Sequence, residues 1–254
     1  MIKLFRQIRQ NLLMENKTGK YFKYAIGEII LVVIGILIAL QINNTNNLKQ
    51  ERKIEQEYLQ SLQAEFELNL ENLETLIALN KEMTEDVEKL LTLFDKSILD
   101  TINDTLTAVI LNDVMDNYDI YMPSLGVLTD LISSGNLNLI QNKKLRHQLA
   151  SFEISLDRID DQEKTAEKEF HAIRDLFNEK SSLQKLFTQI GWYEKKQNSI
   201  SDTMNYESLL KSVQFENSLL SFHAMNRTSN NRIFPDFKTT IENILLEIEK
   251  DLEK

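Results

Sequence analysis

The chain has 254 residues, a formal net charge of −10, six glycines, two prolines and no cysteine. The lack of cysteine excludes a disulfide framework and thiolate chemistry. The acidic balance argues against a nucleic-acid partner, whose phosphates require a basic surface. Because helix breakers are few and Leu, Glu, Lys and Gln are abundant, an all-α fold is expected.

Residues 1–23 form a basic segment, in which six cations face a single acid, Glu15, and give a net charge of +5. The rest of the chain then carries −15. Apolar positions near the N-terminus fall on one helical face, which is typical of an amphipathic helix in the headgroup layer. A short basic tail with incidental periodicity is the alternative. The cations expected to contact lipid headgroups are Lys3, Arg6, Arg9, Lys17, Lys20 and Lys23.

Residues 24–42, reading YAIGEIILVVIGILIALQI, are the longest apolar run. A helix rising ~1.5 Å per residue needs about 20 residues to cross the ~30 Å hydrocarbon core, so the run predicts one transmembrane helix. A cleaved signal peptide is the alternative, but its apolar core is typically only about 7–15 residues long and a small-x-small site should follow it. Because cations near a span stay in the cytoplasm, the N-terminus is expected inside and residues 43–254 in the periplasm.

Three residues of this predicted span share one helical face: Glu28, Gly35 and Ala39. Gly35 and Ala39 form a small-xxx-small pair, which permits the close approach of a second helix. Such pairs also arise in plain anchors, so self-association is one of two hypotheses. Glu28 is the one charge in the run. It either reaches the interface and pairs with Lys20 or Lys23, or has a function in the membrane.

Hydrophobic spacing after the span predicts a series of amphipathic helices. Steps of three and four over residues 54–94 predict a long helix that continues the span. A second helix is expected over 104–121, ended by Pro123, and then a short helix capped by Ser124 and closed by Gly135. The positions of the second helix expected to face inward are Leu106, Val109, Ile110 and Val114.

The most regular pattern lies in the segment that Asn142 opens as an N-cap. Its seam residues alternate at spacings of four and three, with Glu163 as one acidic interruption, and this predicts left-handed packing against another long helix. The seam residues are Leu145, Leu149, Phe152, Leu156, Ile159, Glu163, Ala166, Phe170, Ile173 and Phe177.

Two more helices are expected after a corner at Gly191 and Trp192, one over 209–224 and a last one that starts near Pro235, with a polar break over 226–231 between them. The predicted fold is thus a single transmembrane helix followed by an elongated antiparallel helical bundle with coiled-coil-like packing.

No catalytic, cofactor-binding or metal-binding residue is expected. His147, His171 and His223 do not stand in the spacings that place two metal ligands on one helical face. Glu163, Glu167 and His171 are spaced at i, i+4 and i+8, which in so acidic a helix is interpreted as a solvated face. The sequence also has no P-loop, dinucleotide-binding glycine loop or G-x-S-x-G turn.

Two stretches of the sequence carry a family resemblance. MIKLFRQIRQNLLMENKTGKYFKYAIGEIILVVIGILIALQINN and ISSGNLNLIQNKKLRHQLASF resemble an uncharacterised family, a domain of unknown function, of single-span bacterial membrane proteins common in Bacteroidota. Members usually carry a tryptophan shortly after the span, where this chain has Thr45. The resemblance implies an inner-membrane location and supplies no activity, cofactor or catalytic residue.

These observations favour a structural or accessory protein of the bacterial inner membrane, without catalysis, that acts through protein–protein contacts in the periplasm. Its expected partners are membrane lipids and either further copies of the chain or other envelope proteins. One alternative is a periplasmic small-molecule sensor that signals through a partner, which a pocket with convergent polar groups would favour. A second is a membrane-bound hydrolase, which needs carboxylates or histidines clustered at a cleft.

Overall fold

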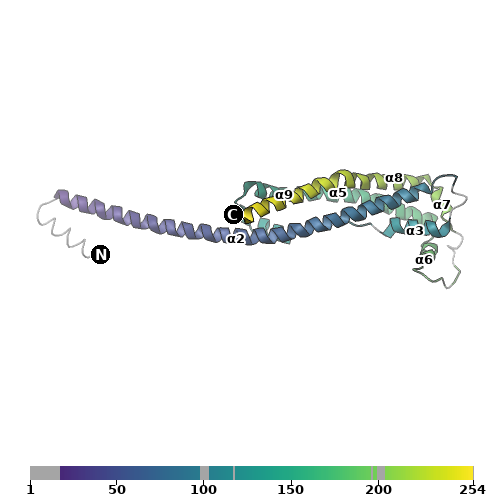
Figure 1. The fold of residues 1–254 in the computed structure, drawn as a ribbon, viewed down its shortest axis with the longest axis horizontal. Coiled ribbons are helices and arrows are strands. Elements are labelled where there is room, and N and C mark those ends of the chain that lie inside the picture. The colour runs from purple at the N-terminus through teal and green to yellow at the C-terminus, as the bar shows by residue number, and fades with distance from the viewer. Residues whose placement is uncertain (1–17, 98–102, 117, 196, 199–203, 254) are drawn as a thin grey trace. The chain divides into compact units, whose positions relative to one another are not determined.

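The computed structural model describes residues 18–97, 103–116, 118–195, 197–198 and 204–253, and every regular element in them is helical (Figure 1). The expected all-α class is therefore confirmed. The elements are α2 (Thr18–Thr92), α3 (Asp104–Asp116), α4 (Gly126–Ser133), the 3-10 helix η2 (Asn136–Leu139), α5 (Lys143–Lys180), α6 (Leu183–Gln189), α7 (Glu207–Leu210), α8 (Val213–Thr228), the π-helix η4 (Ser229–Ile233) and α9 (Phe234–Leu252).

The chain divides into two units, residues 1–57 and residues 58–254. All described residues of the first unit belong to α2, which continues to Thr92 in the second. The predicted continuity between the apolar run and the long amphipathic helix is thus confirmed. The N-terminal part of α2 reaches a mean hydropathy of 2.6 over 18 residues, so it is long and apolar enough to be a membrane span or a signal sequence.

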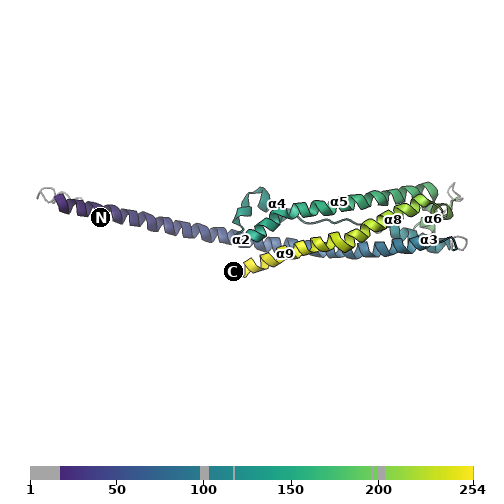
Figure 2. The same ribbon diagram turned by 90° about the horizontal axis from the view of Figure 1, so that it is seen from above.

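The second unit, called the body below, packs around two apolar cores. The first core joins α2, α4, α5 and α9, and in it the Phe152 ring lies 4.9 Å from that of Phe66 and 5.4 Å from that of Phe237. The second core contains residues of α2, α3, α5, α6, α7 and α8, and in it the Phe170 ring lies 5.7 Å from that of Phe222. In Figures 1 and 2, α5, α8 and α9 run alongside residues 58–92 of α2.

The predicted seam of α5 faces these cores. Every seam position is buried except Leu156 and Glu163, which are half-buried. The Asn142 side chain accepts the backbone N–H groups of Lys144 at 3.0 Å and Leu145 at 3.2 Å. Asn142 is therefore the N-cap that the sequence predicted, and the spacing identified the buried face correctly.

The helix expected over 104–121 ends earlier, at Asp116, and its register differs from the prediction. Leu106 and Val109 are exposed, whereas the inward positions include Ala108, Leu111 and Val114. Residues 118–125 have no regular structure and are called the strap below. The sequence prediction was wrong here because the strap packs its aromatic rings against the body instead of forming another helical turn. The Tyr118 ring lies 4.8 Å from that of Phe170 in α5, and the Tyr121 ring lies 5.5 Å from that of Phe237 in α9.

The junction of α8 and α9 also differs from the expected polar break. The chain stays helical through η4, one π turn, into α9, whose first turn contains Pro235 as predicted. Asn226 is buried; its amide donates to the Phe222 carbonyl oxygen at 2.9 Å and accepts from the Asn80 amide at 2.7 Å. Because the Asn226 amide is paired inside the body, it does not interrupt the helix.

Candidate functional site

The three residues predicted to pack a membrane helix all lie in α2. Ala39 is exposed and Glu28 is half-buried and has interaction partners. A Cβ atom added at Gly35 would meet no atom within 4 Å beyond its own turn of the helix, so no other described part of the chain covers this position. The structure thus leaves room at Gly35 for a second helix, and self-association remains a prediction.

The six cations predicted to contact lipid are placed only in part. Lys23 is an exposed residue of α2, and Lys20 belongs to the backbone of the same helix. Lys3, Arg6, Arg9 and Lys17 lie outside the described residues. The amphipathic helix predicted near the N-terminus lies there too, and both remain predictions.

The strap and the start of α4 are fastened to α2 by two buried polar side chains, Asn69 and Glu65. The Asn69 amide donates to the Ser124 carbonyl oxygen at 2.8 Å and accepts the Ser124 N–H at 2.7 Å. The Glu65 carboxylate accepts the N–H groups of Val127 at 2.8 Å and Leu128 at 3.0 Å. Glu65 therefore caps α4 from a different helix, and Ser124 does not form the cap that the sequence predicted.

The strap is fastened to α5 through Glu163. The Tyr121 N–H donates to the Glu163 carboxylate at 2.9 Å, and the Tyr118 hydroxyl donates to the Glu163 backbone oxygen at 3.0 Å. Burial raises the pKa of Glu163 to about 7; the Tyr121 N–H opposes this rise, and the charges of Asp160 and Asp119 add to it. The acidic interruption of the seam is thus the residue that joins the strap to α5.

A groove of about 390 Å³ lies between the strap and α5. It gathers the carboxylates that the hydrolase hypothesis requires, although no described histidine lines it. Glu163, the one acid there with a strongly raised pKa, is hydrogen-bonded to the strap and so has a structural role. The acidic lining residues are Glu153, Asp157, Asp160 and Glu163.

Glu163, Glu167 and His171 do not converge. Exposed His171 lies 3.6 Å from the Glu167 carboxylate, while Glu163 is hydrogen-bonded to the strap. Within the described residues, no group of three His, Cys, Asp or Glu side chains is arranged to hold a metal ion.

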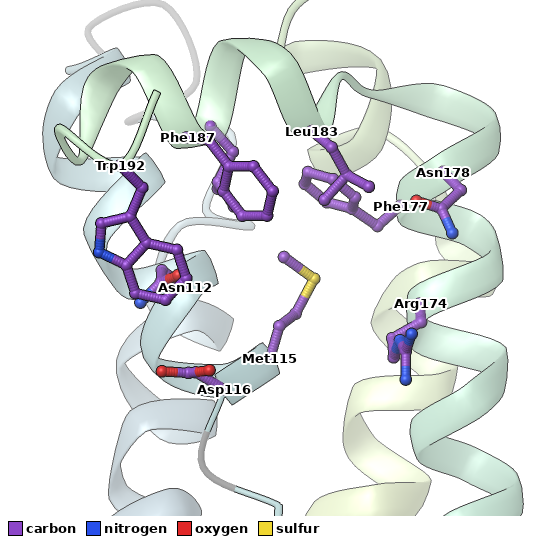
Figure 3. Close-up of a pocket in the computed structure, with 10 residues that line it drawn as sticks. Asn112, Met115, Asp116, Arg174, Phe177, Asn178, Leu183, Phe187 and Trp192 are labelled. Carbon is purple, nitrogen blue, oxygen red and sulfur yellow. The ribbon is translucent and has the colours of Figure 1, made fainter. Parts of the chain in front are cut away.

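A second candidate site is a pocket of about 310 Å³ between α3, α5 and α6, called the tip pocket below (Figure 3). An apolar lining is combined with a few convergent polar groups, as is usual for ligand sites. Its apolar lining residues are Met115, Phe177, Leu183, Leu186, Phe187 and Trp192, and its polar ones are Asn112, Asp116, Arg174 and Asn178.

The polar groups of the tip pocket come in two pairs, each spaced four residues apart on one helix. Asn112 and Asp116 belong to α3, and Arg174 and Asn178 belong to α5. This spacing places both members of a pair on the same helical face. In Figure 3 the two pairs lie on opposite sides of the pocket, with Met115 between them.

The aromatic wall of the tip pocket is held by the C-terminal cap of α6. Gly191 has a φ of +83°, and its N–H donates to the Thr188 carbonyl oxygen at 3.3 Å. The Trp192 N–H donates to the Phe187 carbonyl oxygen at 2.8 Å, and the two rings lie 5.6 Å apart. This is a Schellman motif with its usual apolar contact, so Trp192 is positioned by backbone geometry that favours glycine.

Sequence reasoning found the Gly191–Trp192 corner but not the pocket beside it. The signals that could have indicated the pocket were its two polar pairs. In each pair, one on α3 and one on α5, a carboxamide residue and a charged residue stand four positions apart. Glu65 and Asn69, which fasten the strap, carried a similar signal because they stand four apart beside the apolar face of α2.

The comparisons with known proteins give one match. A family model described as "Family of unknown function (DUF6090)" matches residues 28–218. No curated protein and no solved structure matches the chain. The expected membership of an uncharacterised family is confirmed, whereas its bacterial distribution and single-span topology remain predictions.

Proposed function

Since the chain belongs to DUF6090, a family of unknown function, we propose a function from its own residues. It is a membrane-anchored accessory protein that acts through protein–protein contacts and performs no catalysis. Residues 24–42 span the bacterial inner membrane, and residues 43–254 form an antiparallel helical bundle in the periplasm. Its partners are further copies of the chain or other envelope proteins.

The exposure of the apolar run carries this proposal. All large apolar side chains from Ile26 to Ile42 are between 47 % and 63 % exposed, and lipid is the solvent that suits such a surface. The helix continues unbroken to Thr92, which favours an uncleaved anchor over a signal sequence. The basic residues before the run favour a cytoplasmic N-terminus.

Reporter fusions test the topology. A periplasm-active reporter placed after Lys254 should be active, and the same reporter placed after Lys23, before the span, should be inactive. If only a cytoplasm-active reporter were active after Lys254, residues 43–254 would lie in the cytoplasm and the proposed orientation would be wrong. Release of the full chain by an alkaline carbonate wash would contradict the anchor itself.

Exposed aromatic and aliphatic side chains at the tip of the body support a role in protein contacts. Trp192 is 61 % exposed, and Leu183 and Tyr193 are each more than 40 % exposed. Aromatic side chains of this kind are enriched in the residues that dominate protein interfaces. The heptad-like packing of α5 provides a stiff helical support for such a surface.

Crosslinking in native membranes tests the accessory function. A photoreactive amino acid at Tyr193 should give discrete adducts, either with a second copy of the chain or with one other envelope protein. The same label at Asn217, an exposed position of α8, serves as the control. Equal, diffuse labelling at both positions would remove the support for a specific contact at the tip.

The sensor is the second candidate, and the tip pocket is the observation that favours it. The pocket combines apolar walls with polar groups from two helices. A sensor of this kind would signal through a partner protein. Direct ligand titration, described below, tests this candidate separately from the anchor.

A further inference from the structure

The two charges of the tip pocket, Asp116 and Arg174, are exposed to solvent. Asp116 on α3 and Arg174 on α5 form no ion pair within the part of the chain that the structure describes, and the Arg174 guanidinium lies 5.9 Å from the centroid of the Phe170 ring. They lie on opposite sides of the pocket in Figure 3. A ligand that pairs with both charges would carry a positive charge at one end and a negative charge at the other.

Each charge is accompanied by a carboxamide. Asn112 lies one turn before Asp116, and Asn178 lies one turn after Arg174. A carboxamide both donates and accepts hydrogen bonds, and so does a peptide group. The walls of the pocket thus offer what the backbone of a short peptide needs between its charged ends.

The middle of the pocket is apolar and partly aromatic. The Phe187 and Trp192 rings are tilted by 32° to each other, and Met115 lies between the two polar pairs. Methionine adapts its shape readily and makes favourable contacts with aromatic rings. The volume of about 310 Å³ lies at the lower end of the range of about 300–1,000 Å³ that is usual for ligand pockets, so a ligand of a few residues suits it.

We propose that the tip pocket binds a short apolar peptide with free ends, of two or three residues. Asp116 receives the N-terminal ammonium group, Arg174 receives the C-terminal carboxylate, Asn112 and Asn178 hydrogen-bond the backbone, and the side chains contact Met115, Phe187 and Trp192. This inference names a ligand class for the sensor candidate and rests on it, but it does not require the membrane anchor or the protein contacts.

The single tryptophan of the chain provides the assay. Full-length protein in detergent micelles is titrated with leucyl-phenylalanine while Trp192 emission is followed, and calorimetry on the same samples reports binding independently of the fluorophore. Saturable binding in either readout is expected. Phenylalanine carries both charges on one carbon atom and should bind more weakly, as should glycyl-glycine, which has no apolar side chain.

Matched variants and blocked peptides assign the two ends. Asp116→Asn and Arg174→Gln should each weaken binding of the free dipeptide by about two- to fivefold, as expected for exposed ion pairs. Acetylation of the peptide should abolish the effect of Asp116→Asn, and amidation should abolish that of Arg174→Gln, because each pair is then already broken. Asp161→Asn and Arg227→Gln, which lie outside the pocket lining, are the charge-matched controls.

Three results would overturn the proposal. The first is no saturable binding in either readout. The second is equal weakening by the pocket and control variants, which would indicate a general charge effect. The third is unchanged binding of the acetylated peptide together with loss on amidation, which would identify the C-terminal tail of a longer chain as the occupant. None of these results would alter the tests of the anchor or of the protein contacts.

Discussion

Asn69 holds the backbone of Ser124 with both ends of its side-chain amide. Its Nδ2 donates to the Ser124 oxygen at 2.8 Å, and its Oδ1 accepts the Ser124 N–H at 2.7 Å. The Asn69 side chain is fully buried, so these two bonds replace water for both partners. The relationship joins α2 to a segment 55 residues away and fixes where the strap crosses the body.

Asn69→Ala should therefore lower the free energy of unfolding by about 1–3 kcal/mol, because it leaves the Ser124 N–H and C=O without partners. Urea unfolding of the full chain in mild detergent, followed by circular dichroism, measures this. Asn217→Ala, at an exposed position of α8, should change the free energy by no more than about 0.5 kcal/mol. Equal effects of the two substitutions would show that the strap contributes little to the fold.

Glu163 should make stability depend on pH. Its pKa in the folded chain is raised from the ordinary value of 4.5 to about 7, mainly by burial. Between these values the folded chain retains the proton and the unfolded chain has lost it, so the free energy of unfolding falls as pH rises through this window. Glu163→Gln keeps an acceptor oxygen for the Tyr121 N–H and removes the titration.

Urea midpoints of the wild type and of Glu163→Gln, measured at intervals from pH 4.5 to 7.5, test this dependence. The midpoint should fall with pH more steeply in the wild type. Asp161→Asn, on the exposed side of α5, should keep the wild-type slope. Parallel curves for all three proteins would mean that Glu163 titrates normally and that the strap admits water.

The aromatic seam of α5 should dominate the stability of the body. Phe152 is fully buried in the first core, and Phe170 is 5 % exposed in the second. Truncating a buried phenylalanine to alanine lowers the free energy of unfolding by about 3–5 kcal/mol. Phe152→Ala and Phe170→Ala should each clearly lower the melting temperature. Glu167→Ala, at an exposed position, should change it little. Similar small shifts for all three would contradict the two-core packing.

The Gly35 face of α2 should mediate self-association in a membrane. A Cβ atom added at Gly35 meets no atom within 4 Å beyond its own turn of the helix, so a loss of association in Gly35→Ile is expected to come from contact with another molecule. Dimer-reporter or crosslinking signal in membranes should fall for Gly35→Ile. It should be unchanged for Leu37→Ile, which lies off that face.

Glu28→Gln examines the same face. Association should survive this substitution if Glu28 only reaches the membrane interface, and should weaken if Glu28 pairs across helices. If the dimer-reporter or crosslinking signal of Gly35→Ile equalled that of the wild type, residues 24–42 would act as an anchor without self-association through this face.

Local chemistry explains why some elements were predictable. The Asn142 cap, the turn at Gly135 with its φ of +76° and the buried seam of α5 each depend on neighbouring residues and on helical periodicity. The inward face of α3 was not predictable in this way. Leu106 and Ala108 are both apolar residues of the same short helix next to Thr107, so the local sequence does not separate them. The position of the neighbouring helices buries Ala108 and leaves Leu106 exposed.

The sequence by itself determined the helical class, the apolar run of residues 24–42 and the course of α2 and α5, because backbone propensity and hydrophobic spacing act within one segment. Only the tertiary structure decided that Glu65 caps α4, that Glu163 joins the strap to α5 and that Asn112, Asp116, Arg174 and Asn178 line one pocket. Each of these arrangements joins residues that are distant along the chain. Their geometry depends on how the cores pack, and no local pattern specifies it.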